Sequence, residues 1–222
     1  MSGLSEYTLI RSRRRKSISV NVDEKGQVVV RAPYYVTKMQ IESFLFANRG
    51  WIEKRRSQIL REQAKYPPLK GVQGEKLLYL GEWISLDTGH VKKSVLKDGV
   101  LYVPGRDPLS EIEKWYRSEA SRIMPALTAR YASAMGVSYS RVGITSARTR
   151  YGSCSGRDSI NYTFRLMMFP PRCIKYVAVH ELCHTLQKNH SAAFWALVGR
   201  AVPDYREIKR WMDQNSAIMN MI

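Results

Sequence analysis

The clearest alternation of apolar and polar side chains lies at residues 160–168, where apolar residues occupy every second position. A period of two residues predicts a β-strand there. Weaker alternation at residues 17–22 and 27–31 flanks the turn-forming sequence Asp23-Glu24-Lys25-Gly26, and this arrangement predicts a β-hairpin. Short apolar runs around glycine turns predict further strands at residues 77–87, 93–103 and 141–146.

Helical segments are interspersed with these strands. Thr37 is a suitable N-cap for one long helix over about residues 38–63, which Pro67-Pro68 would end. A second helical region is expected from Asp107 to residue 134, kinked or divided at Pro125. The small, polar residues 153–159 are expected to form a loop. Three more helices are predicted at about residues 172–188, 191–202 and 205–213.

These elements predict an α+β protein. We expect an N-terminal β-rich, basic region containing one long helix at residues 1–105. A second domain is expected at residues 106–222, where helices pack on a small, mainly antiparallel sheet.

The composition is that of a soluble globular protein, with 44% hydrophobic and 25% charged residues in a chain of 222. Intrinsic disorder and collagen-like sequence are excluded. Three cysteines are too few, and an odd number, for a secreted disulfide framework. The N-terminal residues include no apolar core of a signal peptide, and no stretch reaches the length of a membrane span. We therefore expect a cytoplasmic protein.

Positive charge is concentrated in two blocks of a chain whose formal net charge is +17. Residues 1–65 contain 14 basic and 6 acidic residues, and residues 141–175 contain 7 basic and 1 acidic residue. Such blocks either solvate exposed strand faces or bind an anionic partner, such as a nucleotide or nucleic acid.

His180-Glu181-Leu182-Cys183-His184 has the form H-E-x-x-H inside a predicted helix. Residues four apart lie on the same helix face, so both imidazoles can reach one metal ion. Glu181 is rotated about 100° from His180 on an α-helix, which places its carboxylate beside the metal, where a base for an activated water belongs. Cys183 is interpreted as a small buried hydrophobe rather than a ligand. Cys154 paired with a histidine could act as the nucleophile of a cysteine hydrolase. We favour metal binding, because the nearby histidines are better explained as metal ligands.

His190 follows the motif closely. On an unbroken helix it would lie about 15 Å beyond His180, so the helix must end between His184 and His190. Asn189 is well placed to make that turn. Three protein ligands and one open position describe a catalytic Zn²⁺ site. The spacing equals that of the metzincins, but Gln187 stands where they have glycine, so we do not predict a metzincin.

Several segments around this motif carry a family resemblance. They are Arg11 to Lys16, Val28 to Pro33, Tyr151 to Ser155, Ile160-Asn161, Arg165-Leu166, Tyr176 to Val179, Asn189 to Ser191, Phe194-Trp195 and Pro203 to Tyr205. With them, the chain resembles the YgjP-like zinc metallopeptidases over nearly its whole length. The resemblance implies a zincin-like core in residues 106–222, with an active-site helix packed on the sheet. It also implies His180, His184 and His190 as zinc ligands and Glu181 as general base.

The sequence departs from the family at Tyr151, where tryptophan is usual. Nucleotide pyrophosphatase activity has also been associated with the family, so the resemblance does not fix the substrate. We predict a zinc-dependent peptidase that binds an extended peptide along the strand at residues 160–168. Arg165, Tyr162 and Tyr205 are candidate substrate or oxyanion contacts.

Two other functions stay open at this point. Arginines around the motif suit phosphate oxygens and favour hydrolysis of a nucleoside triphosphate, although no glycine-rich phosphate loop accompanies them. These arginines are Arg141, Arg148, Arg150, Arg157, Arg165 and Arg172. The N-terminal basic residues with Tyr34, Tyr35 and Trp51 favour instead a nucleic-acid-binding module that retains a zinc site; those residues are Arg11, Arg13, Arg14, Arg15 and Lys16.

Overall fold

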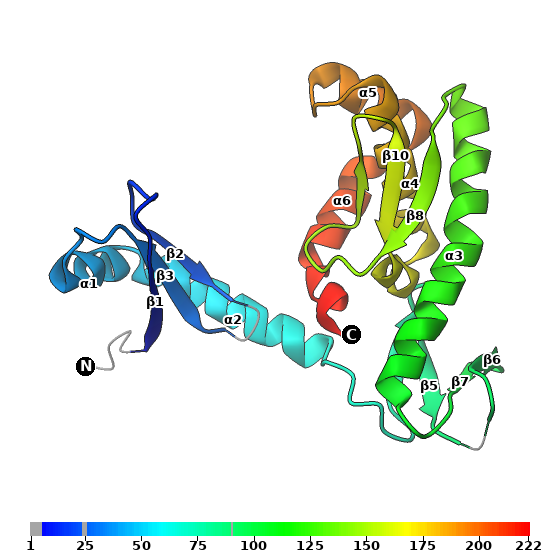
Figure 1. Ribbon diagram of the computed structural model, residues 1–222, viewed down its shortest axis with the longest axis horizontal. Helices are drawn as coiled ribbons and strands as arrows, with labels where there is room; N and C mark the ends of the chain where they lie inside the picture. Colours follow the sequence, from blue (N-terminus) through cyan, green and yellow to red (C-terminus); the bar gives the residue numbers. More distant parts are fainter. Residues whose placement is uncertain (1–5, 24–25, 90) are drawn as a thin grey trace. The chain divides into compact units, whose positions relative to one another are not determined.

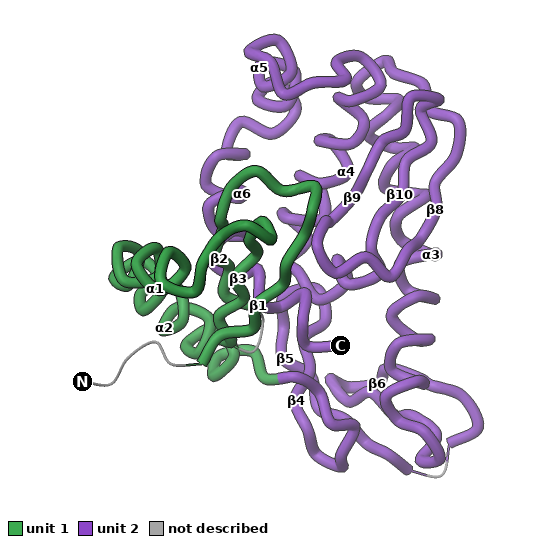
Figure 2. The backbone as a smooth tube through the Cα atoms, turned by 60° about the vertical axis from the view of Figure 1, so that its left-hand side comes forward, with its two compact units in different colours: residues 1–67 green, residues 68–222 purple. Residues whose placement is uncertain are grey.

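The computed structural model describes residues 6–23, 26–89 and 91–222 (Figure 1). The chain forms two compact units, residues 1–67 and 68–222 (Figure 2). The division therefore falls between Pro67 and Pro68, whereas the sequence suggested a boundary after residue 105. None of the described helices combines the length and hydrophobicity needed to cross a membrane.

The first unit contains a three-stranded sheet in the order β1-β3-β2. β1 (Tyr7–Arg11) runs parallel to β3 (Val28–Ala32), and β2 (Ser19–Val22) runs antiparallel to it. The predicted hairpin is confirmed in its two strands, β2 and β3, while turn residues Glu24 and Lys25 lie outside the described residues. Alternate residues of β3 are buried, which places the core on one face of the sheet.

Two helices complete this unit, α1 (Lys38–Ala47) and α2 (Arg49–Lys65). The prediction of one long helix is therefore wrong. The break lies at Asn48, whose side-chain amide donates to the Phe44 carbonyl at 2.8 Å. Such a bond from an asparagine side chain competes with the helical backbone pattern and favours interruption.

The second unit begins with a four-stranded sheet in the order β4-β5-β7-β6. Its strands are β4 (Lys76–Tyr79), β5 (Glu82–Asp87), β6 (Val95–Lys97) and β7 (Val100–Tyr102). The Tyr116 hydroxyl donates to the Leu78 carbonyl, and the Leu80 N–H donates to the Met167 carbonyl at 2.7 Å. These bonds tie the sheet to elements after residue 105, which explains why the compact unit starts earlier than predicted.

The long helix α3 (Pro108–Met135) runs beside this sheet (Figure 1). The Asp107 side chain accepts from the Ser110 N–H at its start, and Gly136 ends it in the left-handed conformation. The helix continues through Pro125, so the division that the sequence allowed there is absent.

A second sheet of this unit has the order β8-β10-β9. β10 (Ser159–Thr163) pairs in parallel with β8 (Arg141–Thr145) and antiparallel with β9 (Gly152–Cys154). The sheet is thus mixed, which corrects the expectation of a mainly antiparallel one. β9 also lies in the segment predicted to be loop.

The strand predicted at residues 160–168 is only half strand. After Thr163 the chain forms the 3₁₀ helix η1 (Phe164–Met168), in which all five residues are buried. The Thr163 hydroxyl donates to the Ala147 carbonyl at 2.7 Å and accepts from the Arg165 N–H, which turns the backbone out of the strand.

Four further segments follow: α4 (Pro171–Leu186), α5 (Ala192–Ala201), α6 (Tyr205–Gln214) and the 3₁₀ helix η2 (Ser216–Asn220). Figure 1 shows β8 and β10 in the same layer, with α3 and α4 alongside. α4 contacts both α3 and β9. The α+β class predicted from the sequence is confirmed.

Candidate active site

α4 is buried on most of its surface. Val177, Ala178, Val179, Leu182 and Cys183 are all at most 3% exposed, because α3, β9 and α6 pack around this helix. Cys183 is therefore a buried apolar side chain, as its sequence context indicates, and burial raises the pKa of its thiol to about 11. Among the described residues, the group whose donor atoms converge comprises the three histidines and does not include Cys183.

His180 and His184 lie one turn apart on the remaining face of α4, with ring centroids 4.9 Å apart. The helix ends at Leu186, and Gln187 is in an extended conformation. This turn returns the chain so that His190 Nε2 lies 3.1 Å from His180 Nε2. The helix ends between the second and third histidines as predicted, with Gln187 as its C-cap residue, and Asn189 lies in the bend that follows without adopting the left-handed conformation.

One nitrogen atom from each of the three histidines lies within 4.8 Å of the others. Because His184 Nδ1 is 3.0 Å from the Gln187 carbonyl oxygen, its proton belongs on Nδ1 and the lone pair on Nε2. Burial and the neighbouring rings of His184 and His190 lower the pKa of His180 to about 3, so this ring is neutral. Convergent imidazole nitrogens are a donor set that zinc favours in proteins, and the residues present fit such an ion.

Aromatic rings hold these histidines in place. Phe194 stacks on His184 with centroids 4.5 Å apart, and Trp195 stacks on His190 at 5.6 Å. Both belong to α5, whose N-terminus is capped by the Ser191 hydroxyl. The start of α5 therefore fixes two of the three imidazole planes.

Glu181 is buried, with 5% of its surface exposed. Burial raises the pKa of its carboxyl group to about 8, and the charge of Arg150 partly opposes this rise. Its carboxyl group lies against Gly152 of β9: a Cβ atom on Gly152 would be 2.6 Å from Glu181 Oε1. Glu181 is thus confined between α4 and β9, in contact with a glycine that was not predicted to belong to the site.

Tyr151, the departure from the usual tryptophan, precedes this glycine. Its ring packs edge-on against Phe169 with centroids 5.3 Å apart, and its hydroxyl donates to the Met212 carbonyl at 3.4 Å. A tyrosine therefore fills this position and anchors the start of β9 to α6.

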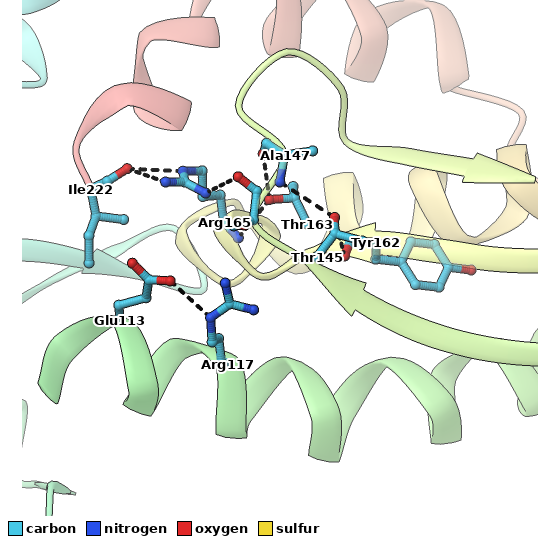
Figure 3. Close-up of polar contacts among 9 residues, drawn as sticks. Glu113, Arg117, Thr145, Ala147, Tyr162, Thr163, Arg165 and Ile222 are labelled. Atoms are coloured by element: carbon cyan, nitrogen blue, oxygen red, sulfur yellow. Dashed lines mark hydrogen bonds and ion pairs between the residues drawn. The ribbon is translucent and has the colours of Figure 1, made fainter. Parts of the chain in front are cut away.

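Arg165 and Tyr162, two of the candidate substrate contacts, have partners within the protein (Figure 3). Arg165 is 2% exposed and donates from Nε and Nη2 to the Ile222 main-chain oxygen at 3.0 and 2.6 Å. Its Nη1 donates to the Ser146 carbonyl at 2.8 Å. Tyr162 is fully buried, with its hydroxyl 3.1 Å from Thr128 Oγ1. The polar groups of both side chains are therefore bonded within the protein and are not presented to a substrate.

Tyr205, the third candidate contact, lies nearer the histidines. Its ring stacks on Trp195 with centroids 5.3 Å apart and planes 13° from parallel. Since Trp195 stacks in turn on His190, the three rings form a continuous stack.

Three of the arginines around the motif have partners within the protein. Arg165 binds main-chain oxygens, Arg141 donates to Ser159 Oγ at 3.0 Å, and Arg172 lies over the Trp211 ring. Fewer of these guanidinium groups are therefore available to bind a triphosphate than the sequence suggested.

Two solved structures resemble part of the chain: the metallopeptidase zymogen of Pyrococcus abyssi abylysin and that of Methanocaldococcus jannaschii jannalysin. The first is 21% identical with a TM-score of 0.38, and the second is 17% identical with a TM-score of 0.37. Each match covers 41% of this chain and 94% of the other. No curated protein matches at a significant level.

The sequence profile described as "YgjP-like, metallopeptidase domain" matches residues 16–215, nearly the whole chain. That match includes His180, Glu181, His184 and His190, and both compact units. The chain belongs to the YgjP-like family of metallopeptidases.

Proposed function

We propose that this protein is a zinc-dependent peptidase in which Glu181 acts as the general base. The observation that carries the proposal is the convergence of three histidine nitrogens within 4.8 Å, beside a buried carboxyl group. A metallopeptidase family implies a divalent metal, and imidazole donors favour zinc among the common ones.

His180, His184 and His190 would hold the zinc ion, leaving one position open for water or substrate. When bound, zinc supplies Lewis acidity, which makes a water acidic and polarises a carbonyl group. The Gln187 carbonyl keeps the Nδ1 proton on His184, so that Nε2 stays available as a donor atom. Phe194 and Trp195 hold the rings in the required planes.

Glu181 would move the protons of the reaction. Its carboxylate would accept a proton from the attacking water and deliver it to the amide nitrogen that leaves. Contact with Gly152 confines the carboxyl group, so little freedom is lost when substrate binds. Burial raises its proton affinity, which suits a group that must both accept and return a proton.

The peptide would bind along β9 rather than along residues 160–168. β10 is the central strand, paired with β8 on one side and β9 on the other, so it offers no edge to a substrate. β9 is an edge strand and contacts α4 beside Glu181. An extended peptide added to this edge would pass beside the histidines and Glu181.

The test is a paired assay of zinc-loaded wild type and the Glu181→Gln variant on a peptide library and on nucleoside triphosphates. Loss of a general base lowers kcat by about 10²–10⁴-fold, so we expect peptide cleavage to fall by that amount while zinc stoichiometry is unchanged. Glu82→Gln, at an exposed carboxylate of the same unit, is the matched control and should cleave like wild type.

Cleavage that survives in Glu181→Gln would exclude this residue as the base. Triphosphate hydrolysis that is lost in Glu181→Gln, without any peptide cleavage, would replace the peptidase by a nucleotide hydrolase. Zinc that still binds with full affinity to a His190→Ala variant would exclude the proposed ligand set.

A further inference from the structure

A cluster of positive charge in the first unit lies between two of its strands. The connection between β1 and β2 contains four consecutive basic residues and no acidic one. Arg13, Arg14 and Lys16 are exposed in this connection. No carboxylate of the described residues forms an ion pair with any of the three, whereas Lys38 and Arg49 are paired within their helices.

Two tyrosines lie at the same end of the sheet. β1 and β3 are parallel, so the β1–β2 connection and the segment after β3 leave the sheet together. Tyr34 and Tyr35, in that segment, are 60% and 75% exposed. Together with Arg13, Arg14 and Lys16 they form a surface that we call the basic–aromatic tip.

The tip is held by specific hydrogen bonds. Arg11 Nη1 donates to the carbonyl oxygens of Pro33, Tyr34 and Val36 at 2.9, 2.9 and 2.8 Å. Arg11, which the sequence grouped with the binding residues, is thus a structural residue. The Tyr35 hydroxyl donates to the Lys16 carbonyl at 3.1 Å, which joins the two segments directly.

The segment that carries the tyrosines is also fixed at its C-terminal end, where α1 begins. Thr37 and Gln40 form a capping box at the start of α1. The Arg13 guanidinium lies 6.0 Å from the centre of the Tyr34 ring. Arginines and exposed rings are therefore presented together by a constrained backbone, and the cost of ordering them on binding is small.

We propose that the basic–aromatic tip binds single-stranded nucleic acid. The three unpaired cations would contact phosphates, and the two tyrosine rings would stack on bases. A duplex hides its base faces, so it would use the cations alone and bind more weakly. An anionic membrane would also meet the cations, and tyrosine rings can lie at a membrane interface, so the test below compares oligonucleotides with vesicles. This inference concerns the first unit alone and does not depend on the peptidase reaction.

The experiment measures binding of the full chain to a fluorescent 20-nucleotide single strand of DNA or RNA across a range of salt concentrations. The tip variant Arg13→Ala/Arg14→Ala/Lys16→Ala removes three cations. A single-strand site loses about 0.7 in the slope of log K against log salt for each phosphate contact, so the slope should fall by about 2. Lys54→Ala/Arg56→Ala/Arg61→Ala removes the same charge from exposed sites on α2 and should leave the slope near that of wild type.

A second pair of variants tests stacking. Tyr34→Ala and Tyr35→Ala should each weaken binding by about fivefold or more, because stacking on one base is worth a factor of that size. Phe46→Ala removes an equally exposed ring from α1 and should change nothing.

Three outcomes would overturn the proposal. If the slope of log K against log salt falls equally in the two triple variants, binding depends on the net charge of the protein and not on the basic–aromatic tip. Unchanged binding in both tyrosine variants would remove the role of stacking. Loss of binding to phosphatidylserine vesicles in the tip variant, with oligonucleotide binding intact, would assign the tip to a membrane surface.

Discussion

Gly152 gives the sharpest test of the site at the scale of single residues. A methyl group there would approach Glu181 Oε1 to 2.6 Å and Cγ to 2.8 Å, so the carboxyl group must move. A misplacement of about 1 Å costs on the order of 100-fold in rate. We expect Gly152→Ala to lower kcat/KM for peptides by about that factor while the histidines still bind one zinc ion. Activity and zinc content of the purified variant check this.

Gly156 provides a control for that substitution. It lies after β9 in the same region, and a Cβ atom on it would meet nothing within 4 Å. Gly156→Ala should therefore keep wild-type activity. If Gly152→Ala is as active as wild type, Glu181 is not confined as the structure indicates.

Tyr205 is the candidate contact that lies in the ring stack beside His190. If its hydroxyl donates to the developing oxyanion, Tyr205→Phe should lower kcat by about 10²-fold, with KM nearly unchanged, because the lost bond forms only in the transition state. Tyr205→Leu removes the stacking ring as well, so it should also weaken zinc binding. Steady-state kinetics check this. If kcat of Tyr205→Phe is unchanged, the hydroxyl has no role in the reaction and Tyr205 serves only in packing.

At the scale of elements, a polar contact joins β4 to α3. The Tyr79 hydroxyl donates to Glu119 Oε2 at 2.5 Å, and Arg122 forms an ion pair with the same carboxylate at 2.6 Å. The hydrogen bond from Arg122, together with that from Tyr79, lowers the pKa of Glu119 in the folded state. Tyr79 in turn has its pKa raised to about 12, by burial and by its bond to Glu119.

A carboxyl group with a lowered pKa stabilises the fold above its ordinary pKa, and this contribution is lost as pH falls through the folded-state pKa. We expect Glu119→Gln to lower the free energy of unfolding by about 1 kcal/mol at pH 7, after allowance for partial exposure. The difference from wild type should shrink at pH 3. Urea unfolding at both pH values measures it, and an equal difference at pH 7 and pH 3 would contradict the linkage.

The sequence predicted best those elements whose formation depends on residues within or next to the element. The helix carrying His180 and His184 follows from spacing and from Pro171 at its start. Residues 164–168 continue the alternating pattern yet form a 3₁₀ helix, because every side chain there is buried by other elements. β9 was missed because Gly-Ser-Cys has little β propensity and is held in place by pairing with β10.

The candidate site also combines features that depend on local sequence with features that depend on the fold of the whole molecule. The sequence predicts that the helix ends between His184 and His190, because a continuous helix cannot bring His190 near His180, and the structure places that end at Leu186. Gly152 against Glu181, and the Arg165 bonds to Ile222 and Ser146, join segments that are distant in the chain. No local pattern encodes contacts of that kind, so the sequence revealed neither the partners of Arg165 nor the contact between Gly152 and Glu181.

The extent of the second unit makes a prediction about the whole chain. A fragment of residues 68–222 retains the Tyr116–Leu78 and Leu80–Met167 hydrogen bonds, whereas a fragment of residues 106–222 loses both. The shorter fragment leaves the buried Tyr116 hydroxyl without its acceptor and uncovers apolar surface that the four-stranded sheet packs against. These losses amount to several kcal/mol, or about 10 °C or more in Tm for a domain of this size.

We therefore expect residues 68–222 to melt cooperatively on their own and residues 106–222 to melt at least about 10 °C lower or without a cooperative transition. Thermal melts of the two fragments, followed by circular dichroism, test this expectation. A third fragment, residues 1–67, should also melt independently. Equal melting of the two longer fragments would place the boundary after residue 105 and make the four-stranded sheet an accessory. A lower Tm for residues 106–222 would make that sheet part of the structure that supports α3 and, through α3, the helix α4 that carries His180 and His184.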